Sequence, residues 1–164
     1  MFGIPYLHPV LVHFPVAFLI LAALAAFLWL LLGKSFWRQT TTLLLFMGIL
    51  GAFAAYFTGD DVAEAFKDKP AVKALVDRHE DAALWVLILG GIAAAAFVAA
   101  EVSSASNEKK GLDGPDRKLK IRALLFLLVL ATAALVGYTG HLGGSMVWSA
   151  SYDKPPAMAA PSAR

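Results

Sequence analysis

The chain has 164 residues, of which 59% are hydrophobic and 16% are charged, and its formal net charge is +2. This length accommodates one domain, and the composition is too apolar for the surface of a water-soluble protein. The basic residues lie in short connections without interleaved aromatic residues, a pattern that excludes nucleic-acid binding. The absence of cysteine also excludes disulfides, thiolate metal sites, iron–sulfur clusters and covalently attached haem.

Four apolar stretches follow one another along the chain and predict four transmembrane helices. A helix of about 20 residues crosses the hydrocarbon core of a bilayer. The predicted spans cover approximately residues 10–33, 39–58, 80–102 and 120–140. They lack the polar outer stripe of a soluble bundle. We therefore predict an all-α fold, an integral membrane up-down four-helix bundle of residues 1–154, with a disordered Pro-, Ala- and Ser-rich tail at residues 155–164.

The positions of Lys and Arg predict how this bundle is oriented. The connection between the first two spans and the connection between the last two carry Lys34, Arg38, Lys109, Lys110, Arg117, Lys118, Lys120 and Arg122. Because positive residues close to a membrane stay in the cytoplasm, both termini and the 59–80 loop are expected on the periplasmic side of a bacterial inner membrane. In that loop, Pro70 is expected to begin a helix that continues into the third span.

The two halves of the chain resemble each other. His13 opens the first span and His79 precedes the third, while Thr58-Gly59 ends the second span and Thr139-Gly140 ends the fourth. This pattern predicts two parallel two-helix repeats around an axis along the membrane normal. In such a bundle the first and third spans lie diagonally, and His13 and His79 are symmetry mates.

All four histidines of the chain fall at the outer ends of the predicted spans. They are His8, His13, His79 and His141. No titratable side chain lies in the inner half of the membrane between them, which argues against a proton or ion path across the bilayer. Imidazole binds Zn, Cu, Fe and Ni, and paired imidazoles hold b-type haem. The chemistry of this chain is therefore expected at its outer face.

The spacing of helices in a bundle favours haem among these ligands. Diagonal helices lie about 13 Å apart, a distance that suits a histidine–iron–histidine arrangement. We predict haem b between His13 and His79, with His8 and His141 as a second haem-binding pair or as supporting groups. The Leu142-Gly143-Gly144 segment after His141 is predicted to form a turn that lets a flat ligand approach the backbone. The resulting hypothesis is an electron-transfer subunit within a larger redox complex.

Two alternatives remain open from the sequence. The same imidazoles, joined by Asp60 or Glu80, can hold copper, zinc or non-haem iron. The chain can also be a scaffold or assembly subunit without any cofactor. Because it has no nucleophile–base set and no phosphate-binding loop, it is not expected to be an independent enzyme.

Two motifs resemble a known family. The segments Leu7-His8-Pro9-Val10-Leu11-Val12-His13-Phe14-Pro15 and Thr139-Gly140-His141-Leu142-Gly143-Gly144 are similar to those of a bacterial four-span membrane family, domain of unknown function 2231. Some of its members resemble anchors fused to cytochrome c-type domains, which implies electron transfer with such proteins as partners. The family's last motif continues into a Val-Tyr and a further His-Gly. Here the chain continues Met146-Val147-Trp148-Ser149-Ala150, without a counterpart of that histidine.

Overall fold

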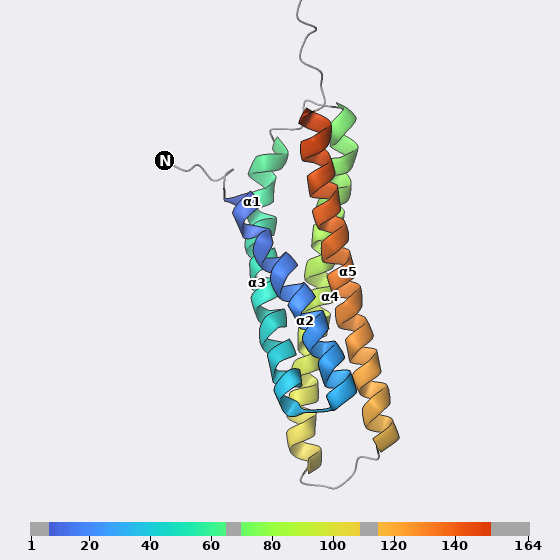
Figure 1. The fold of residues 1–164 in the computed structure, drawn as a ribbon. Coiled ribbons are helices and arrows are strands. Elements are labelled where there is room, and N and C mark those ends of the chain that lie inside the picture. Colours follow the sequence, from blue (N-terminus) through green and yellow to red (C-terminus); the bar gives the residue numbers. More distant parts are fainter. Residues whose placement is uncertain (1–6, 65–69, 109–114, 152–164) are drawn as a thin grey trace, which may run out of the picture.

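A computed structural model describes residues 7–64, 70–108 and 115–151. Within these ranges the chain forms a short helix and four long ones, and no strand. The helices are α1 (His8–Leu11), α2 (His13–Leu32), α3 (Ser35–Glu64), α4 (Pro70–Glu108) and α5 (Pro115–Ser151). Figure 1 shows the long helices running side by side, with the end of α2 and the start of α3 at one end and α1 at the other. The predicted all-α bundle is confirmed.

Local sequence explains several helix boundaries. Gly33 has a φ of 67°, a left-handed conformation that glycine adopts without a steric penalty, and its N–H donates to the Trp29 carbonyl at 2.8 Å. This closes α2 and reverses the chain into α3. Pro70 begins α4 as predicted, because the first turn of a helix does not need its missing N–H. The predicted disordered tail at residues 155–164 lies outside the described residues.

The four long helices form a square in which neighbours are antiparallel. Helix α2 packs against α3 and α5, and α4 packs against the same two helices. Helices α2 and α4 therefore lie diagonally, as predicted for the first and third spans. Leu19, Leu45, Phe97 and Val129, one from each long helix, are fully buried in the centre. The core is thus shared by all four helices.

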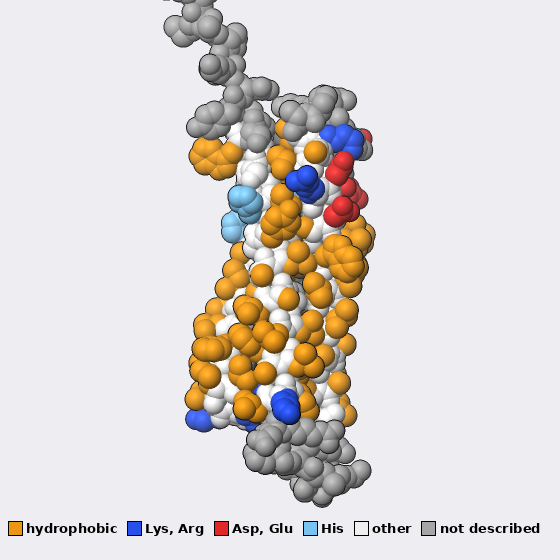
Figure 2. Space-filling view, turned by 90° about the vertical axis from the view of Figure 1, so that its right-hand side faces the viewer, with side chains coloured by type: hydrophobic (Ala, Val, Ile, Leu, Met, Phe, Trp, Pro, Cys, Tyr) orange, Lys and Arg blue, Asp and Glu red, His pale blue; other side chains and the backbone are white. Residues whose placement is uncertain are grey.

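The outward faces of the helices are as apolar as the core. Leu50 on α3 and Leu124 on α5 are 63% and 68% exposed, and large hydrophobic side chains cover the middle of the face shown in Figure 2. All four long helices are long and apolar enough to cross a bilayer. Water would disfavour such a surface, whereas lipid covers it at no cost. The protein is therefore a multi-pass membrane protein whose outer surface contacts lipid.

The internal repeat is present, but its register differs from the one that the motifs suggested. Buried positions of α2 recur in α4 71 residues later, pairing Pro15, Ala22 and Ala26 with Val86, Ala93 and Phe97. Buried positions of α3 recur in α5 84 residues later, pairing Leu45, Ala52 and Ala55 with Val129, Val136 and Thr139. The 71-residue separation of the first set pairs His8, and not His13, with His79. The His and Thr-Gly motifs predicted a different register. Equivalent positions are those that bury the same helix face, and the motifs do not show which face is buried.

Helix α5 also continues through the predicted turn at Leu142-Gly144 and ends at Ser151. Glycine disfavours a helix by about 1 kcal/mol relative to alanine, but the Leu142 side chain between His141 and Gly143 is only 5% exposed. Its burial against the other helices offsets part of that cost. At the end of the bundle where α1 lies, α3, α4 and α5 are therefore all helical.

An ion pair joins α3 to α4 near the end of the bundle where α2 meets α3. Arg38 donates to the Glu101 carboxylate at 2.8 Å and to the Ser104 hydroxyl at 2.7 Å. The Arg38 and Glu101 side chains are only 14% and 25% exposed. Removing one partner would leave the other charge poorly solvated between two helices.

We expect Glu101→Ala to lower the free energy of unfolding by about 2 kcal/mol, less than for a fully buried pair because both groups retain some contact with water. Thermal unfolding in detergent measures this change. Asp77→Ala is the control, since it breaks the Lys73–Asp77 pair, whose side chains are 61% and 55% exposed, and should leave the unfolding temperature unchanged. Equal unfolding temperatures for both variants would contradict a stabilising role for Arg38–Glu101.

Candidate functional site

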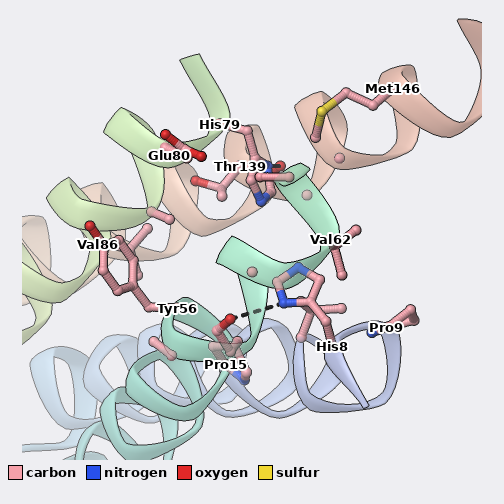
Figure 3. Close-up of a pocket in the computed structure, with 18 of the residues that line it drawn as sticks. His8, Pro9, Pro15, Tyr56, Val62, His79, Glu80, Val86, Thr139 and Met146 are labelled. Atoms are coloured by element: carbon pink, nitrogen blue, oxygen red, sulfur yellow. Dashed lines mark hydrogen bonds between the residues drawn. The ribbon is translucent and has the colours of Figure 1, made fainter. Parts of the chain in front are cut away.

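A cavity of about 320 Å³ opens at the end of the bundle where α1 lies. Its wall is built from α1 to α5 and consists mainly of Val, Ala, Gly and Pro. The polar side chains on the wall are His8, Tyr56, Asp60, His79, Glu80 and Thr139. Figure 3 shows His8 and His79 on opposite sides of this cavity. A mostly apolar cavity with a few convergent polar groups is the usual form of a ligand site.

His8 lies on α1 and is held by α3. Its Nδ1 lies 2.9 Å from the Ala55 carbonyl oxygen and 3.3 Å from the Thr58 hydroxyl. A carbonyl oxygen only accepts hydrogen bonds, so the Nδ1–H of His8 donates to it. The neutral ring then keeps its lone pair on Nε2, the nitrogen that can bind a metal.

His79 lies on α4 and is held by α5 in an equivalent way. Its Nδ1 donates to the Thr139 carbonyl at 3.0 Å. Thr139 is the repeat equivalent of Ala55, so each hairpin fixes its own histidine through the same backbone carbonyl position. Such a bond from the distal nitrogen orients a metal-binding imidazole and raises its basicity. Both histidines are therefore pre-set in the tautomer that a metal ligand requires.

The two rings face each other across the cavity. Their centroids are 6.4 Å apart and their planes are inclined by 73°. In Figure 3 the nitrogen of each ring that is not bonded to a carbonyl is turned toward the other ring. A metal bound to two facing nitrogens at about 2 Å each would separate the ring centroids by about 6 Å. The observed separation fits two imidazoles that share one metal.

The other two histidines lie apart from this pair. His13 is exposed, and its Nδ1 donates to the Pro9 carbonyl one turn earlier at 2.6 Å. His141 is exposed as well, and neither residue lines the cavity. The structure thus brings His79 together with His8, and it does not bring His13 to the same place. His8 and His13 are five residues apart, which corresponds to about 140° around a helix axis, so the two side chains point in different directions.

The cavity has fewer side chains placed to bind a metal ion without a porphyrin than the sequence analysis considered. Within residues 7–64, 70–108 and 115–151, no group of three or more His, Asp or Glu side chains is arranged to hold an ion. Asp60 and Glu80 line the cavity without completing such a set. A haem iron needs only two axial ligands from the protein, because the porphyrin supplies the other four. The donor set and the apolar wall therefore fit a bis-imidazole haem.

Some residues of the site escaped the sequence analysis. The carbonyls of Ala55 and Thr139 are backbone groups, which residue types do not reveal. Met146 on α5 also lines the cavity, with its side chain shown in Figure 3. No signal in the sequence pointed to Met146, because a turn and not a helix was predicted just before it.

Comparison with known proteins gives one match. Residues 3–153 match the model of a family described as "Predicted membrane protein (DUF2231)". No curated protein and no solved structure matches the chain.

Proposed function

The chain belongs to the DUF2231 family of membrane proteins, as its motifs indicated, and we propose that it binds one b-type haem between His8 and His79 and serves as an electron-transfer subunit. The observation that carries this proposal is the facing pair of rings, 6.4 Å apart, each with Nδ1 bonded to a backbone carbonyl of its own hairpin. When bound, the haem supplies an iron that exchanges single electrons.

The protein's own groups perform three tasks at this site. His8 and His79 would hold the iron from opposite hairpins, so a bound haem would join the two halves of the bundle. The carbonyls of Ala55 and Thr139 fix the ring tautomers. The apolar wall excludes water, and low polarity around an iron centre tunes its reduction potential.

The distribution of charge supports an orientation in which this site lies at the periplasmic face of the membrane. Lys34, Lys118 and Lys120 are exposed at the end of the bundle opposite the cavity. In the view of Figure 2, Lys and Arg side chains lie at both ends, but only those at the upper end lie next to Asp and Glu. The positive-inside rule places the end opposite the cavity in the cytoplasm. The haem site then faces the periplasm of a bacterial inner membrane, where membrane-bound or periplasmic redox subunits, such as cytochrome c-type proteins, would exchange electrons with it.

A second candidate function rests on Met146. Met146 lines the same cavity as His8 and His79, and thioether and imidazole ligands together suit Cu(I). In that case the chain would bind copper and not haem.

Spectroscopy of the native protein separates these functions. The chain is purified in mild detergent, and its dithionite-reduced minus oxidised absorbance is recorded together with metal analysis of the same sample. We expect sharp visible bands of b-type haem and one iron per chain. Stoichiometric copper without those bands would support the copper function, and neither metal would contradict both and leave a scaffold role.

A further inference from the structure

Arg122, two turns into α5, lies directly against the turn that joins α2 to α3. Its guanidinium occupies the space that a side chain at Gly33 would fill, since a Cβ atom added there would lie 2.8 Å from the guanidinium carbon. The same carbon lies 5.8 Å from the centroid of the Trp29 ring on α2, within the range of a cation–π contact. Figure 1 shows the end of α2 beside the lower part of α5. The guanidinium is therefore held where α2 and α5 meet, at the end of the bundle opposite the cavity.

The positive charge of Arg122 is not balanced by a carboxylate among the described residues. Arg38, at the same end of the bundle, is paired with the Glu101 carboxylate at 2.8 Å, whereas Arg122 belongs to no such pair. Among the side chains that the structure describes at this end, Glu101 is the only acidic one. The Trp29 ring and the carbonyl end of α2 both attract a cation, but neither carries a full negative charge. Because Arg122 is partly buried, an anion that reaches it from outside would be stabilised.

Two exposed lysines add to the charge of Arg122. Lys34 directly follows the turn between α2 and α3. Lys118 lies one turn before Arg122 on α5, so the two side chains share a helix face. We call Lys34, Lys118 and Arg122 the basic corner. Three cations around one position favour a ligand with a compact negative group, such as a phosphate.

The surface next to the basic corner is apolar and open to lipid. Phe126, one turn after Arg122 on α5, packs against Phe27 of α2 with ring centroids 5.6 Å apart. Phe27 is exposed, and so is Leu31, one turn further along α2. A free phosphate would use only the cations. A molecule with a negative headgroup and acyl chains would contact both parts of this surface.

We propose that the basic corner binds the headgroup of one anionic phospholipid, whose acyl chains lie along the Phe27–Phe126 contact between α2 and α5. The Arg122 guanidinium donates two N–H groups to phosphate oxygens, a geometry that arginine suits. Lys34 and Lys118 add attraction to the negative charge of the headgroup. This site lies at the opposite end of the bundle from the proposed haem site and does not depend on it.

Titration of the purified full chain with phosphatidylglycerol, followed by native mass spectrometry, tests this proposal. One Lys or Arg near a membrane surface strengthens binding of an anionic lipid about fivefold. We expect one tightly bound phosphatidylglycerol per chain, with phosphatidylcholine bound at least about tenfold more weakly. Inorganic phosphate at millimolar concentration should not displace the lipid, because it cannot contact the apolar surface.

Substitutions at exposed lysines separate a defined site from general surface charge. Lys34→Gln and Lys118→Gln should each weaken phosphatidylglycerol binding about fivefold, and Arg122→Gln should weaken it further because two hydrogen bonds are lost. Lys120→Gln is the matched control, since Lys120 is exposed on the same helix but lies about 200° around it from Arg122. It should leave binding unchanged. Circular dichroism verifies that each variant is folded, and the lysine variants keep the test valid if Arg122→Gln does not fold.

Weakening confined to the three basic-corner variants would support the site. Equal weakening by Lys118→Gln and Lys120→Gln would overturn it, because binding would then follow total surface charge. Equal affinity for phosphatidylcholine and phosphatidylglycerol, or displacement of the lipid by inorganic phosphate, would overturn an anionic phospholipid as the ligand.

Discussion

The His8→Ala and His79→Ala variants are expected to purify without b-type haem, each losing the reduced-minus-oxidised bands of the parent protein. The two rings lie 6.4 Å apart on opposite hairpins, so each supplies one of the two bonds from protein to iron. Removal of groups that only support a metal ligand lowers metal affinity by 10- to 100-fold. Loss of the ligand itself should exceed about 100-fold, enough to empty the site during purification.

His13→Ala and His141→Ala are the matched controls for this experiment. Both remove an exposed imidazole from the same end of the bundle, and neither residue lines the cavity. These variants should keep the haem-to-protein ratio of the parent. Retention of haem in both His8→Ala and His79→Ala would contradict the ligand pair, as would its selective loss in His13→Ala.

A second large loss of haem is expected from a substitution that fills the cavity with a larger side chain and leaves both histidines in place. Ala83 lies one turn after His79 on α4 and lines the cavity, so Ala83→Phe would place an aromatic ring in a space of about 320 Å³. Forcing extra volume into a packed site costs about 1–3 kcal/mol, and each 1.4 kcal/mol is tenfold in affinity. The haem content of Ala83→Phe, measured by reduced-minus-oxidised absorbance, should fall at least about tenfold.

Ala95→Phe makes the same substitution on the outward face of the same helix. Ala95 is exposed beside Gly91 in the part of α4 that faces lipid, where an added aromatic ring meets the bilayer. This variant should bind as much haem as the parent. If Ala83→Phe binds haem equally well, the porphyrin does not occupy the cavity between the hairpins.

The membrane fold could be predicted because hydrophobicity around the whole helix circumference is visible in the sequence. Stretches such as 14–32 have no charge, and only lipid accommodates helices that are apolar on every side. Helix ends were harder to predict. The glycines after His141 suggested a turn, yet α5 continues to Ser151, and the burial of Leu142 offsets part of the cost of these glycines in a helix.

The sequence predicted that the histidines lie at one end of the bundle, but not which of them line the same cavity. Four outer histidines indicated a metal or haem site, whereas the choice between His8 and His13 depends on which helix face is buried. His8 lies two turns before the buried Pro15 and shares its face, while His13 lies about 200° away. In a soluble helix, a polar stripe on the exposed side reveals from the sequence which face is buried. These membrane helices have no such stripe, so the sequence does not identify their buried face.

Anomalous X-ray diffraction at the iron absorption edge, on crystals of the purified full-length protein, tests the central claim most directly. We expect one iron peak per chain, bonded to Nε2 of both His8 and His79 at about 2 Å. Iron bonded to His13 or His141, or crystals of the native protein without iron, would contradict the haem site proposed between the two hairpins.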